Sequence, residues 1–489
     1  MSGGCPSMER ASRNAPCGGP WRASGVLVLC AALVGAASLC AGCALYFYGS
    51  PPPRHRADPA RSAIGKALDY LEATQVGGPV RALVGGGDWP GDWPQYIWLP
   101  AFGVRVRDVS PFIPATIHAS LGYVEEAARR GLAGLTADDA ARVRAMRARA
   151  AAFIRRFEAS VEGLPAGVMA YWPPMQEARA YQRTWLSILR GDWLLPVLMR
   201  VVLRGPAPSG AFGPLNIPQL PRAYGIHPDA DTTSVIWACL LDEADSAGTP
   251  RPQPPLAVFA AWRDLGQVPL RYPTAWLERP SGLFLTWLGG PINDVDLVVN
   301  ANVLYCLARY GALDLPGAAE ATAALNRHVE RFLRAHWADP TTPYYTCSLA
   351  PHCSVLRAFR EGPVPGLRPA IERLARDIEE RAQPLPDGTV CWDCGAPDLD
   401  TAAAVLALVA CGRSLELARG GARYLVRTQD PTTGAWRECN LGGGSTESGL
   451  ELMWRCRALT TATALFALVA ARVEFGEGLP DDGPRSEGE

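Results

Sequence analysis

The chain has 489 residues, of which 48% are hydrophobic, enough for a large buried core in one domain or two. Its 47 basic and 48 acidic residues give a formal net charge of -1, and no long basic run is present. Binding to nucleic acid requires a concentrated positive surface, so we expect no nucleic-acid partner.

The first apolar segment lies near the N-terminus. Residues 25–48 carry no charge and are long enough to cross a bilayer as one helix, which ends in the aromatic run Tyr46, Phe47 and Tyr48. We expect a single-pass membrane anchor here, with a cleaved signal sequence ending at Cys43 as the alternative. Basic residues on both sides leave the orientation in the membrane open. Residues 1–24 would form an N-terminal tail, 49–60 a linker and 476–489 a disordered tail.

Residues 61–475 are predicted to form an all-α body. Apolar residues recur at three-to-four spacing in successive segments that are separated by turns rich in Gly, Pro and Asp. Segments 400–411 and 458–471 are almost wholly apolar or small, whereas 137–159 has one polar face. This alternation predicts buried inner helices and solvated outer helices, as in a ring of about a dozen helices. Two smaller lobes are the alternative.

The stretch "PDADTTS", residues 228–234, places Asp229 and Asp231 two positions apart, followed by Thr232. Such a stretch is a good helix N-cap, because Asp and Thr side chains accept hydrogen bonds from free backbone N–H groups. It also suits a proton donor, because burial and a neighbouring carboxylate both raise a carboxyl pKa. The hydroxyls that follow could stabilise the conjugate base after proton transfer.

A second polar cluster stands in "NDVDLVVNANVLY", residues 293–305. Asp294, Asp296, Asn300 and Asn302 precede or enter an apolar helix. An asparagine inside a helix is unfavourable unless its amide bonds another group. One interpretation is a capping run followed by a buried amide that ties helices together. The other is a set of side chains that binds a polar head group or reaches Asp231. Both stay open.

The cysteines do not indicate a metal centre. "CWDC", residues 391–394, has zinc-like spacing, but no second pair of this kind occurs in the sequence. A tetrahedral structural site needs four ligands, so free thiols or a structural disulfide fit better. We therefore expect no bound metal in the protein itself.

The segment "ARYLVRTQDPTTGAW", residues 422–436, ends a helix and continues with Gln429, Gly434 and Trp436. It resembles the QW repeat of terpene cyclases, in which the glutamine ties a helix end to the next turn and the tryptophan stacks on it. "GTVCWDC", residues 388–394, resembles a degraded copy. "DADTT", residues 229–233, is similar to the Asp-x-Asp-Asp motif of class II terpene cyclases, and closer to the Asp-x-Asp-Thr-Thr variant of drimane-type cyclases.

This resemblance implies an α/α toroid over roughly residues 60–475. It also implies that Asp231 protonates an alkene or epoxide, with Asp229 as the first aspartate and Thr232 in place of the third. The substrate would be an isoprenoid or similar lipid, which suits a membrane anchor. No cofactor is implied, although a pyrophosphate substrate would bring Mg²⁺ and need basic residues such as Arg183 or Arg222. The chain lacks a phosphatase-like domain and has few QW repeats, so the substrate stays open.

A carbocation needs stabilisation without nucleophilic capture, and aromatic faces provide it. Trp89 and Trp93 in residues 85–98, "YWPP" at 171–174 and Tyr345 are the candidates for lining the substrate site. For any one of them, ordinary core packing is the stronger interpretation. His118 or His227 could orient or reprotonate the acid.

Two other function classes fit the same features. Helical toroids also carry glycan-active hydrolases and lyases, for which Asp231 and Asp296 would be the paired acids. A toroid that binds a protein or lipid without catalysis is the third hypothesis. An apolar surrounding with one buried acid favours the cyclase, whereas two facing carboxylates favour the glycan enzyme.

Overall fold

The computed structural model describes eleven ranges of the helical body: 63–77, 79–80, 87–99, 104–171, 227–270, 276–290, 293–332, 341–345, 350–360, 362–445 and 451–476. The expected membrane span at 25–48, its flanking tail and linker, and the tail beyond 476 lie outside the described residues. The same holds for Arg183 and Arg222.

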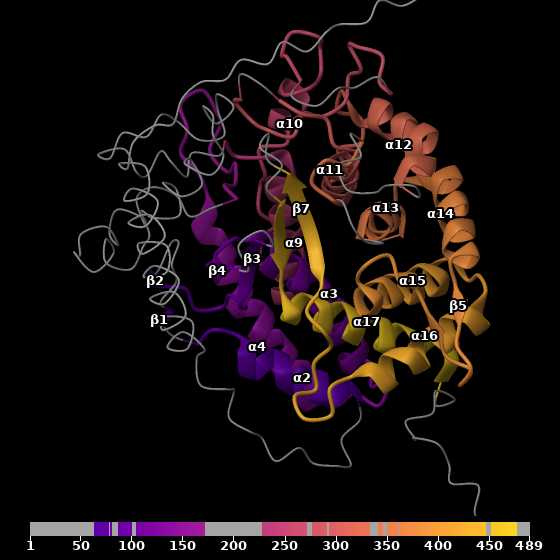
Figure 1. The fold of residues 1–489 in the computed structure, drawn as a ribbon. Helices are drawn as coiled ribbons and strands as arrows, with labels where there is room; N and C mark the ends of the chain where they lie inside the picture. Colours follow the sequence, from indigo (N-terminus) through magenta and orange to yellow (C-terminus); the bar gives the residue numbers. More distant parts are fainter. Residues whose placement is uncertain are drawn as a thin grey trace, which may run out of the picture. The chain divides into compact units, whose positions relative to one another are not determined.

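Six helices form a closed cycle of contacts (Figure 1). They are α3 (Phe112–Arg129), α9 (Ala230–Ala247), α11 (Leu297–Arg309), α13 (Ala350–Arg360), α15 (Pro397–Cys411) and α17 (Arg457–Phe475). Each packs on the next, and α17 packs on α3 to close the cycle. Their sequences explain this position: in α11 every residue from Leu297 to Leu307 is buried, as expected of a helix surrounded by protein.

Further helices pack around these six. They are α2 (Ala63–Thr74), α4 (Ala137–Ile154), α10 (Ala257–Ala261), α12 (Ala318–Phe332), α14 (Arg368–Glu380) and α16 (Leu415–Thr428). The outer helix α14 buries one stripe, which includes Ala370, Leu374 and Ile378, and leaves its charged residues outside. The expectation of a mostly helical body with inner and outer helices is confirmed for the described residues. Two short 3-10 helices, Arg155–Phe157 and Pro365–Leu367, complete the helical structure.

The expectation of no strands is wrong. An antiparallel sheet of four strands joins the two ends of the body in the order β4-β3-β8-β7. Its strands are β3 (Gln95–Leu99), β4 (Val104–Asp108), β7 (Asn440–Ser445) and β8 (Glu451–Arg455). In β3–β8, Ile97 pairs with Trp454, far away in sequence. Two strand pairs are minor: β1 (Pro79–Val80) with β2 (Gly87–Asp88), and β5 (Gln383–Pro384) with β6 (Val390–Cys391).

The inner helices begin at the same end as this sheet. Strand β4 ends directly before α3, and β8 directly before α17. The Trp454 indole N–H donates to the Asp108 carboxylate at 3.2 Å, which joins these two helix starts. The Phe112 ring, at the start of α3, lies 6.3 Å from the ring of Tyr345, which precedes α13. Side chains at the N-terminal ends of different inner helices therefore meet at one place.

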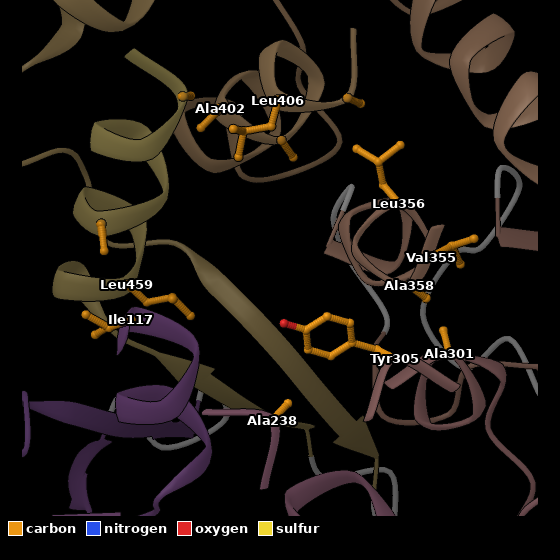
Figure 2. Packing of buried hydrophobic residues seen from close by; sticks show 14 of the residues in the cluster. Ile117, Ala238, Ala301, Tyr305, Val355, Leu356, Ala358, Ala402, Leu406 and Leu459 are labelled. Carbon is orange, nitrogen blue, oxygen red and sulfur yellow. The ribbon is translucent and has the colours of Figure 1, made fainter. Parts of the chain in front are cut away.

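The inward faces of the inner helices are apolar (Figure 2). Tyr305 of α11, Leu406 of α15 and Leu459 of α17 point toward the centre of the cycle in this view, and all three are buried. Ile117 of α3 and Ala238 of α9 belong to the same hydrophobic cluster. Apolar side chains of several inner helices and the phenol of Tyr305 therefore face the centre.

Helix α17 is long and apolar enough to pass as a membrane span, and it is the one such helix in the described part of the chain. It is mostly buried, however, and packs on α2, α3, α15 and α16. A core helix explains its composition. The expected anchor near the N-terminus is a different segment and stays a prediction.

The QW-like segment has the hydrogen bonds that the resemblance implies. The Gln429 amide donates to the carbonyls of Gly434 and Ala63, both at 2.8 Å, and so ties the end of α16 to its own turn and to α2. The Trp436 indole N–H donates to the carbonyl of Leu425 at 2.8 Å. Leu425 stands four residues before the glutamine.

The same arrangement occurs where sequence reasoning did not expect it. The Gln75 amide donates to the carbonyls of Gly91 at 3.1 Å and Met146 at 2.9 Å. The Trp93 indole N–H donates to the carbonyl of Leu71, again four residues before the glutamine. Trp93 therefore holds a turn together, and its assignment to the substrate site stays a prediction.

The expected degraded copy keeps the tryptophan half of this turn. The Trp392 indole N–H donates to the carbonyl of Ile378 at 2.6 Å, and its backbone N–H donates to the Thr401 hydroxyl at 3.1 Å. Ala382 stands four residues after Ile378, where the other two turns have glutamine.

Candidate active site

Helix α9 begins at the "DADTT" stretch. Asp229 is its N-cap, and the Asp229 Oδ1 accepts the backbone N–H of Thr232 at 2.5 Å. The hydroxyl of Ser234 donates to the carbonyl of Asp231, and the hydroxyl of Thr233 accepts the N–H of Met169 at 3.0 Å. These two hydroxyls thus bond backbone groups. The expected hydrogen bonds from them to the Asp231 carboxyl are not formed. The capping interpretation holds for Asp229.

The carboxyl of Asp231 is held from two other elements. The Asn302 amide, on α11, donates to Asp231 Oδ1 at 2.6 Å, and the Tyr345 hydroxyl is hydrogen-bonded to Oδ2. Asp231 is only 8% exposed. The structure therefore brings together three of the residues that the sequence analysis singled out, from three separate segments.

Burial is the main electrostatic influence on this carboxyl, and it raises the pKa of Asp231. The hydrogen bonds from Tyr345 and Asn302 and the positive charge of Arg357 act in the opposite direction. Burial and the nearby Asp231 raise the pKa of Asp229 to about 8, and likewise that of Asp296 to about 8. With pKa values of about 8, Asp229 and Asp296 are mostly protonated at neutral pH.

The second polar cluster divides between the two interpretations. Asp296 caps α11: its Oδ1 accepts the N–H groups of Val298 and Val299, and its Oδ2 accepts that of Tyr344. The Asn300 amide donates to the carbonyl of Phe284 and accepts its N–H, both at 3.0 Å. Both side chains thus bond backbone groups, and their assignment to substrate binding stays a prediction. Asn302, by contrast, faces Asp231.

Asp294 acts on the site through a neighbour. Its Oδ2 accepts the Trp287 indole N–H at 3.0 Å and the Tyr344 hydroxyl at 2.5 Å. The rings of Trp287 and Tyr344 meet edge to face, with centroids 5.7 Å apart. Because Tyr344 precedes Tyr345, these contacts fix the backbone that carries the phenol bonded to Asp231.

Trp89 belongs to the core on the side of α4. Its ring packs on Phe153 and Phe157, with centroids about 6 Å away, and the Arg156 guanidinium lies over it. These contacts explain why a tryptophan stands there without any substrate. Its assignment to the substrate site, like that of Trp93, stays a prediction.

Neither histidine orients the acid. His118 is fully buried and its Nε2 lies 3.2 Å from the Glu243 carboxylate. Glu243 follows Asp231 by twelve residues on α9, which is about 18 Å along the helix. His227 lies just before the motif and is half-buried, and burial lowers its pKa. It is therefore neutral at pH 7.

Sequence reasoning missed Arg357. It lies on α13, and one of its guanidinium nitrogens donates to the Asn302 Oδ1 at 2.6 Å. Its guanidinium also stacks over the Tyr305 ring, 4.7 Å from the centroid. Nothing near Arg357 in the sequence signals this role, because both contacts depend on how α11 and α13 pack.

Tyr171, the described residue of the "YWPP" segment, lies on the other side of the acids. Its ring is 6.4 Å from that of Trp454 in β8. Burial is the main cause that raises the pKa of Tyr171, and the charges of Asp108, Asp229 and Asp231 add to it. Tyr171 is thus the second phenol whose charge state couples to Asp231.

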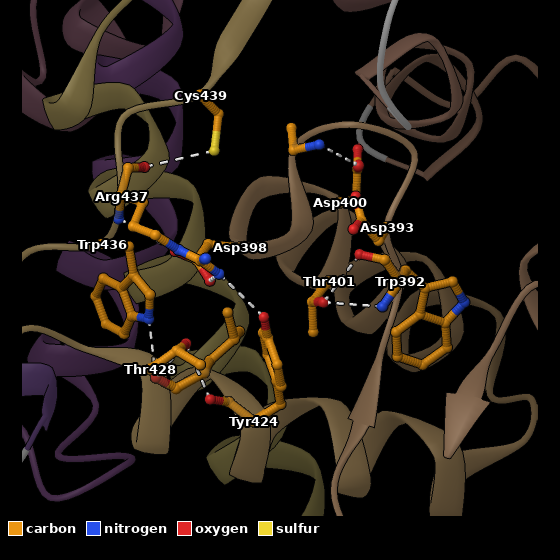
Figure 3. Close-up of polar contacts among 12 residues, drawn as sticks. Trp392, Asp393, Asp398, Asp400, Thr401, Tyr424, Thr428, Trp436, Arg437 and Cys439 are labelled. Atoms are coloured by element: carbon orange, nitrogen blue, oxygen red, sulfur yellow. Dashed lines mark hydrogen bonds and ion pairs between the residues drawn. The ribbon is translucent and has the colours of Figure 1, made fainter. Parts of the chain in front are cut away.

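The acids in the first turn of α15 are structural (Figure 3). Arg437 donates two hydrogen bonds to the Asp398 carboxylate, both at 2.9 Å. The Asp400 carboxylate accepts the N–H groups of Cys394 and Ala396. Cys391 and Cys394 of "CWDC" are free thiols. In the described part of the chain, no group of three or more His, Cys, Asp or Glu could hold a metal ion.

Solved structures similar to this chain include type II terpene cyclases. A variant of MstE from Scytonema, in complex with its substrate geranylgeranyl dihydroxybenzoate, is 13% identical, with a TM-score of 0.43 over 84% of this chain and 96% of that one. Apo MstE is 14% identical, with a TM-score of 0.39 over the same shares. A protein from Actinoplanes is 19% identical, with a TM-score of 0.42 over 84% and 98%. No family model and no curated protein matches the sequence.

Proposed function

We propose that the chain is a class II terpene cyclase-like enzyme in which Asp231 protonates an isoprenoid and starts its cyclisation. The observation that carries this proposal is the Asp231 carboxyl itself: it is nearly buried and bonded by Asn302 on one oxygen and by Tyr345 on the other. Burial favours the neutral acid, which is the form that can donate a proton.

The surrounding groups suit proton transfer to a carbon–carbon double bond. The π electrons of the alkene form a C–H bond with the acid proton, and the O–H electrons remain on Asp231. The carboxylate so formed is stabilised by the Asn302 N–H, the Tyr345 hydroxyl and the charge of Arg357. The cation on the substrate then closes rings and is discharged by loss of a proton or capture of a nucleophile.

The apolar inward faces support an apolar substrate. Tyr305, Leu406 and Leu459 come from three inner helices and point toward the centre of the cycle (Figure 2). A polyprenyl chain fits such a lining, and the α/α toroid would wrap around it. The proposed anchor at residues 25–48 would hold the enzyme beside the bilayer where such a substrate dissolves. Mg²⁺ would enter only as the companion of a pyrophosphate substrate.

No observation favours the glycan alternative. A glycosidase needs two carboxyl groups that face the scissile bond. Asp296, the expected partner of Asp231, accepts three backbone N–H groups and is fully buried as a helix cap. With Asp296 occupied as a helix cap, a single proton donor at Asp231 suits protonation of an alkene better.

The test compares products from the full-length chain with those from Asp231→Asn. Each protein is incubated with farnesyl and geranylgeranyl pyrophosphate, squalene and oxidosqualene, and extracts are analysed by mass spectrometry. We expect a cyclised product from the parent and a loss of about a hundred- to ten-thousand-fold in Asp231→Asn, the usual contribution of a general acid.

Asp245→Asn is the matched control, because Asp245 lies on the same helix and pairs with Arg251 at the surface. It should keep the parent activity. A parent that makes no cyclised product from any of the four substrates would contradict the proposed chemistry.

A further inference from the structure

Asn302 lies between an acid and a cation, and these two neighbours set the direction of its amide. A guanidinium has only N–H donors, so the atom that faces Arg357 must be an acceptor. The Asn302 Oδ1 accepts from Arg357 at 2.6 Å. Its NH₂ group is thereby turned toward Asp231 Oδ1, also at 2.6 Å.

This direction decides where the proton of the neutral acid resides. Asp231 Oδ1 already accepts an N–H from Asn302, so the acid proton belongs on Oδ2, the oxygen at the Tyr345 hydroxyl. With the Asn302 amide reversed, its carbonyl would face Asp231. The acid proton would then move to Oδ1 and be held by that carbonyl, away from Tyr345.

The contacts of Arg357 suit it to set the direction of the Asn302 amide rather than to form an ion pair. Within the described residues it has no carboxylate partner, and it contacts Asn302 and the Tyr305 ring. Arg309 provides the contrast, because it stacks on the same ring at 5.8 Å but is paired with Asp242 at 2.5 Å. The two arginines share one phenol, yet only Arg357 bonds Asn302.

We propose that Arg357 is a positioning residue that acts through Asn302 and fixes the transferable proton of Asp231 on Oδ2, beside Tyr345. The proposal rests on the proposed function in taking Asp231 as the acid. Arg357 itself does not touch the reacting atoms.

Infrared difference spectroscopy of the full-length chain tests this without any substrate. The C=O stretch of protonated Asp231 is followed against pH and assigned by its loss in Asp231→Asn. In Arg357→Gln the new amide can accept as well as donate, so Asn302 can reverse, and a positive charge that favours the carboxylate is lost. We expect the band to change frequency and to disappear at higher pH than in the parent.

Two controls define the cause. Arg357→Lys keeps a donor-only cation and should retain the parent frequency and titration. Arg309→Gln removes the other arginine on the Tyr305 ring and should leave the band unchanged. An Arg357→Gln band identical to the parent band would overturn the proposal.

A double-mutant cycle separates positioning from a direct effect of charge. Asn302→Leu removes the amide through which Arg357 is proposed to act. In that background Arg357→Gln should change the frequency of the C=O band much less than in the parent, because the amide whose direction sets the position of the proton is gone. The direct effect of the lost charge on the titration should remain in both backgrounds, whereas an equal change of frequency in both would refute positioning through Asn302.

Activity gives a separate readout. We expect Arg357→Gln to lower kcat about ten- to a hundred-fold, as for a lost hydrogen bond to a charged group, with little change in KM. Because the infrared measurement uses no substrate, a parent that makes no product would refute the proposed function alone.

Discussion

At the scale of single residues, Asp231 and Asp229 differ in what they bond. Asp229 accepts a backbone N–H and caps a helix, whereas Asp231 is bonded only by side chains from other elements. The residue types in "DADTT" predict both roles, but not which aspartate has which. Which aspartate has which role depends on Asn302 and Tyr345. Both lie far from Asp231 in the sequence, so the sequence does not predict that they contact it.

The raised pKa of Asp229 makes a prediction for stability. The folded-state pKa is about 8 against an ordinary value of 3.8, so the folded protein binds this proton more tightly than the unfolded chain does. The contribution is complete below about pH 4 and is lost as the pH rises through about 8. Asp229→Asn keeps an N-cap side chain and removes the titration.

We therefore expect Asp229→Asn to become more stable relative to the parent as the pH rises from about 4 to about 8. Urea unfolding at several pH values measures this. Asp138→Asn, at the exposed start of α4, serves as the control and should show no such trend. A difference that is constant with pH would show that Asp229 titrates alike in both states.

The pH dependence of catalysis follows from the same reasoning at Asp231. Under the proposed function the neutral acid is the active form, so kcat should fall as the pH rises through the pKa of Asp231 in the complex with substrate. Since burial raises that pKa, activity should persist to a higher pH than an ordinary aspartic acid allows. Activity that instead increases steadily with pH would contradict a role for Asp231 as acid.

At the scale of elements, the turns built on glutamine, glycine and tryptophan fix how neighbouring outer helices meet, α16 with α2 and α2 with α4. One of them was predictable from sequence because Gln429, Gly434 and Trp436 lie within eight residues. The turn of Gln75, Gly91 and Trp93 was not, because sixteen residues separate its glutamine from its glycine. The four-stranded sheet was missed for a related reason: β7 is half glycine, and β3 pairs with β8 from the other end of the body.

Two glycines with nearly the same backbone conformation allow a matched test of such a turn. Gly434 has φ +74°, and a Cβ there would lie 2.3 Å from the carbonyl oxygen of Lys66. Gly388 has φ +76° and open space around it. Gly388→Ala should cost about 1–2 kcal/mol of unfolding free energy from the left-handed backbone alone.

Gly434→Ala should cost about 1–3 kcal/mol more, because the backbone of α2 must move away. Chemical denaturation of both variants gives the comparison. Equal losses in the two variants would show that the end of α16 is not held against α2 in solution.

At the scale of the whole helical body, the alternation of apolar and two-faced segments predicted the inner and outer helices. It could not predict which helices are neighbours, because a linear stack and a closed cycle bury the same faces. Helix α17 packs on α3, whose sequence lies over 300 residues earlier, and this contact makes the arrangement a closed cycle.

This closure leads to a prediction about coupling around the cycle. Ala467 is fully buried on α17, and Ala467→Leu should cost about 1–3 kcal/mol by overpacking. Amide hydrogen exchange should increase in α3 and α15, which contact α17, and much less in α12, which packs on α11 and α14. Val473→Leu, at an exposed site on the same helix, is the control and should change neither the stability nor the amide exchange. Unchanged exchange in α3 of Ala467→Leu would show that α17 does not close the cycle.

The shared starting end of the inner helices also shapes the electric field inside the protein. Each helix has a partial positive charge at its N-terminus and a partial negative charge at its C-terminus. Dipoles that point the same way add along the axis of the cycle instead of cancelling. Asp231 lies at the positive end. Under the proposed function, a cation formed beside it would be repelled by these helix starts and drawn toward the opposite ends of the helices, which would give the cyclisation a direction.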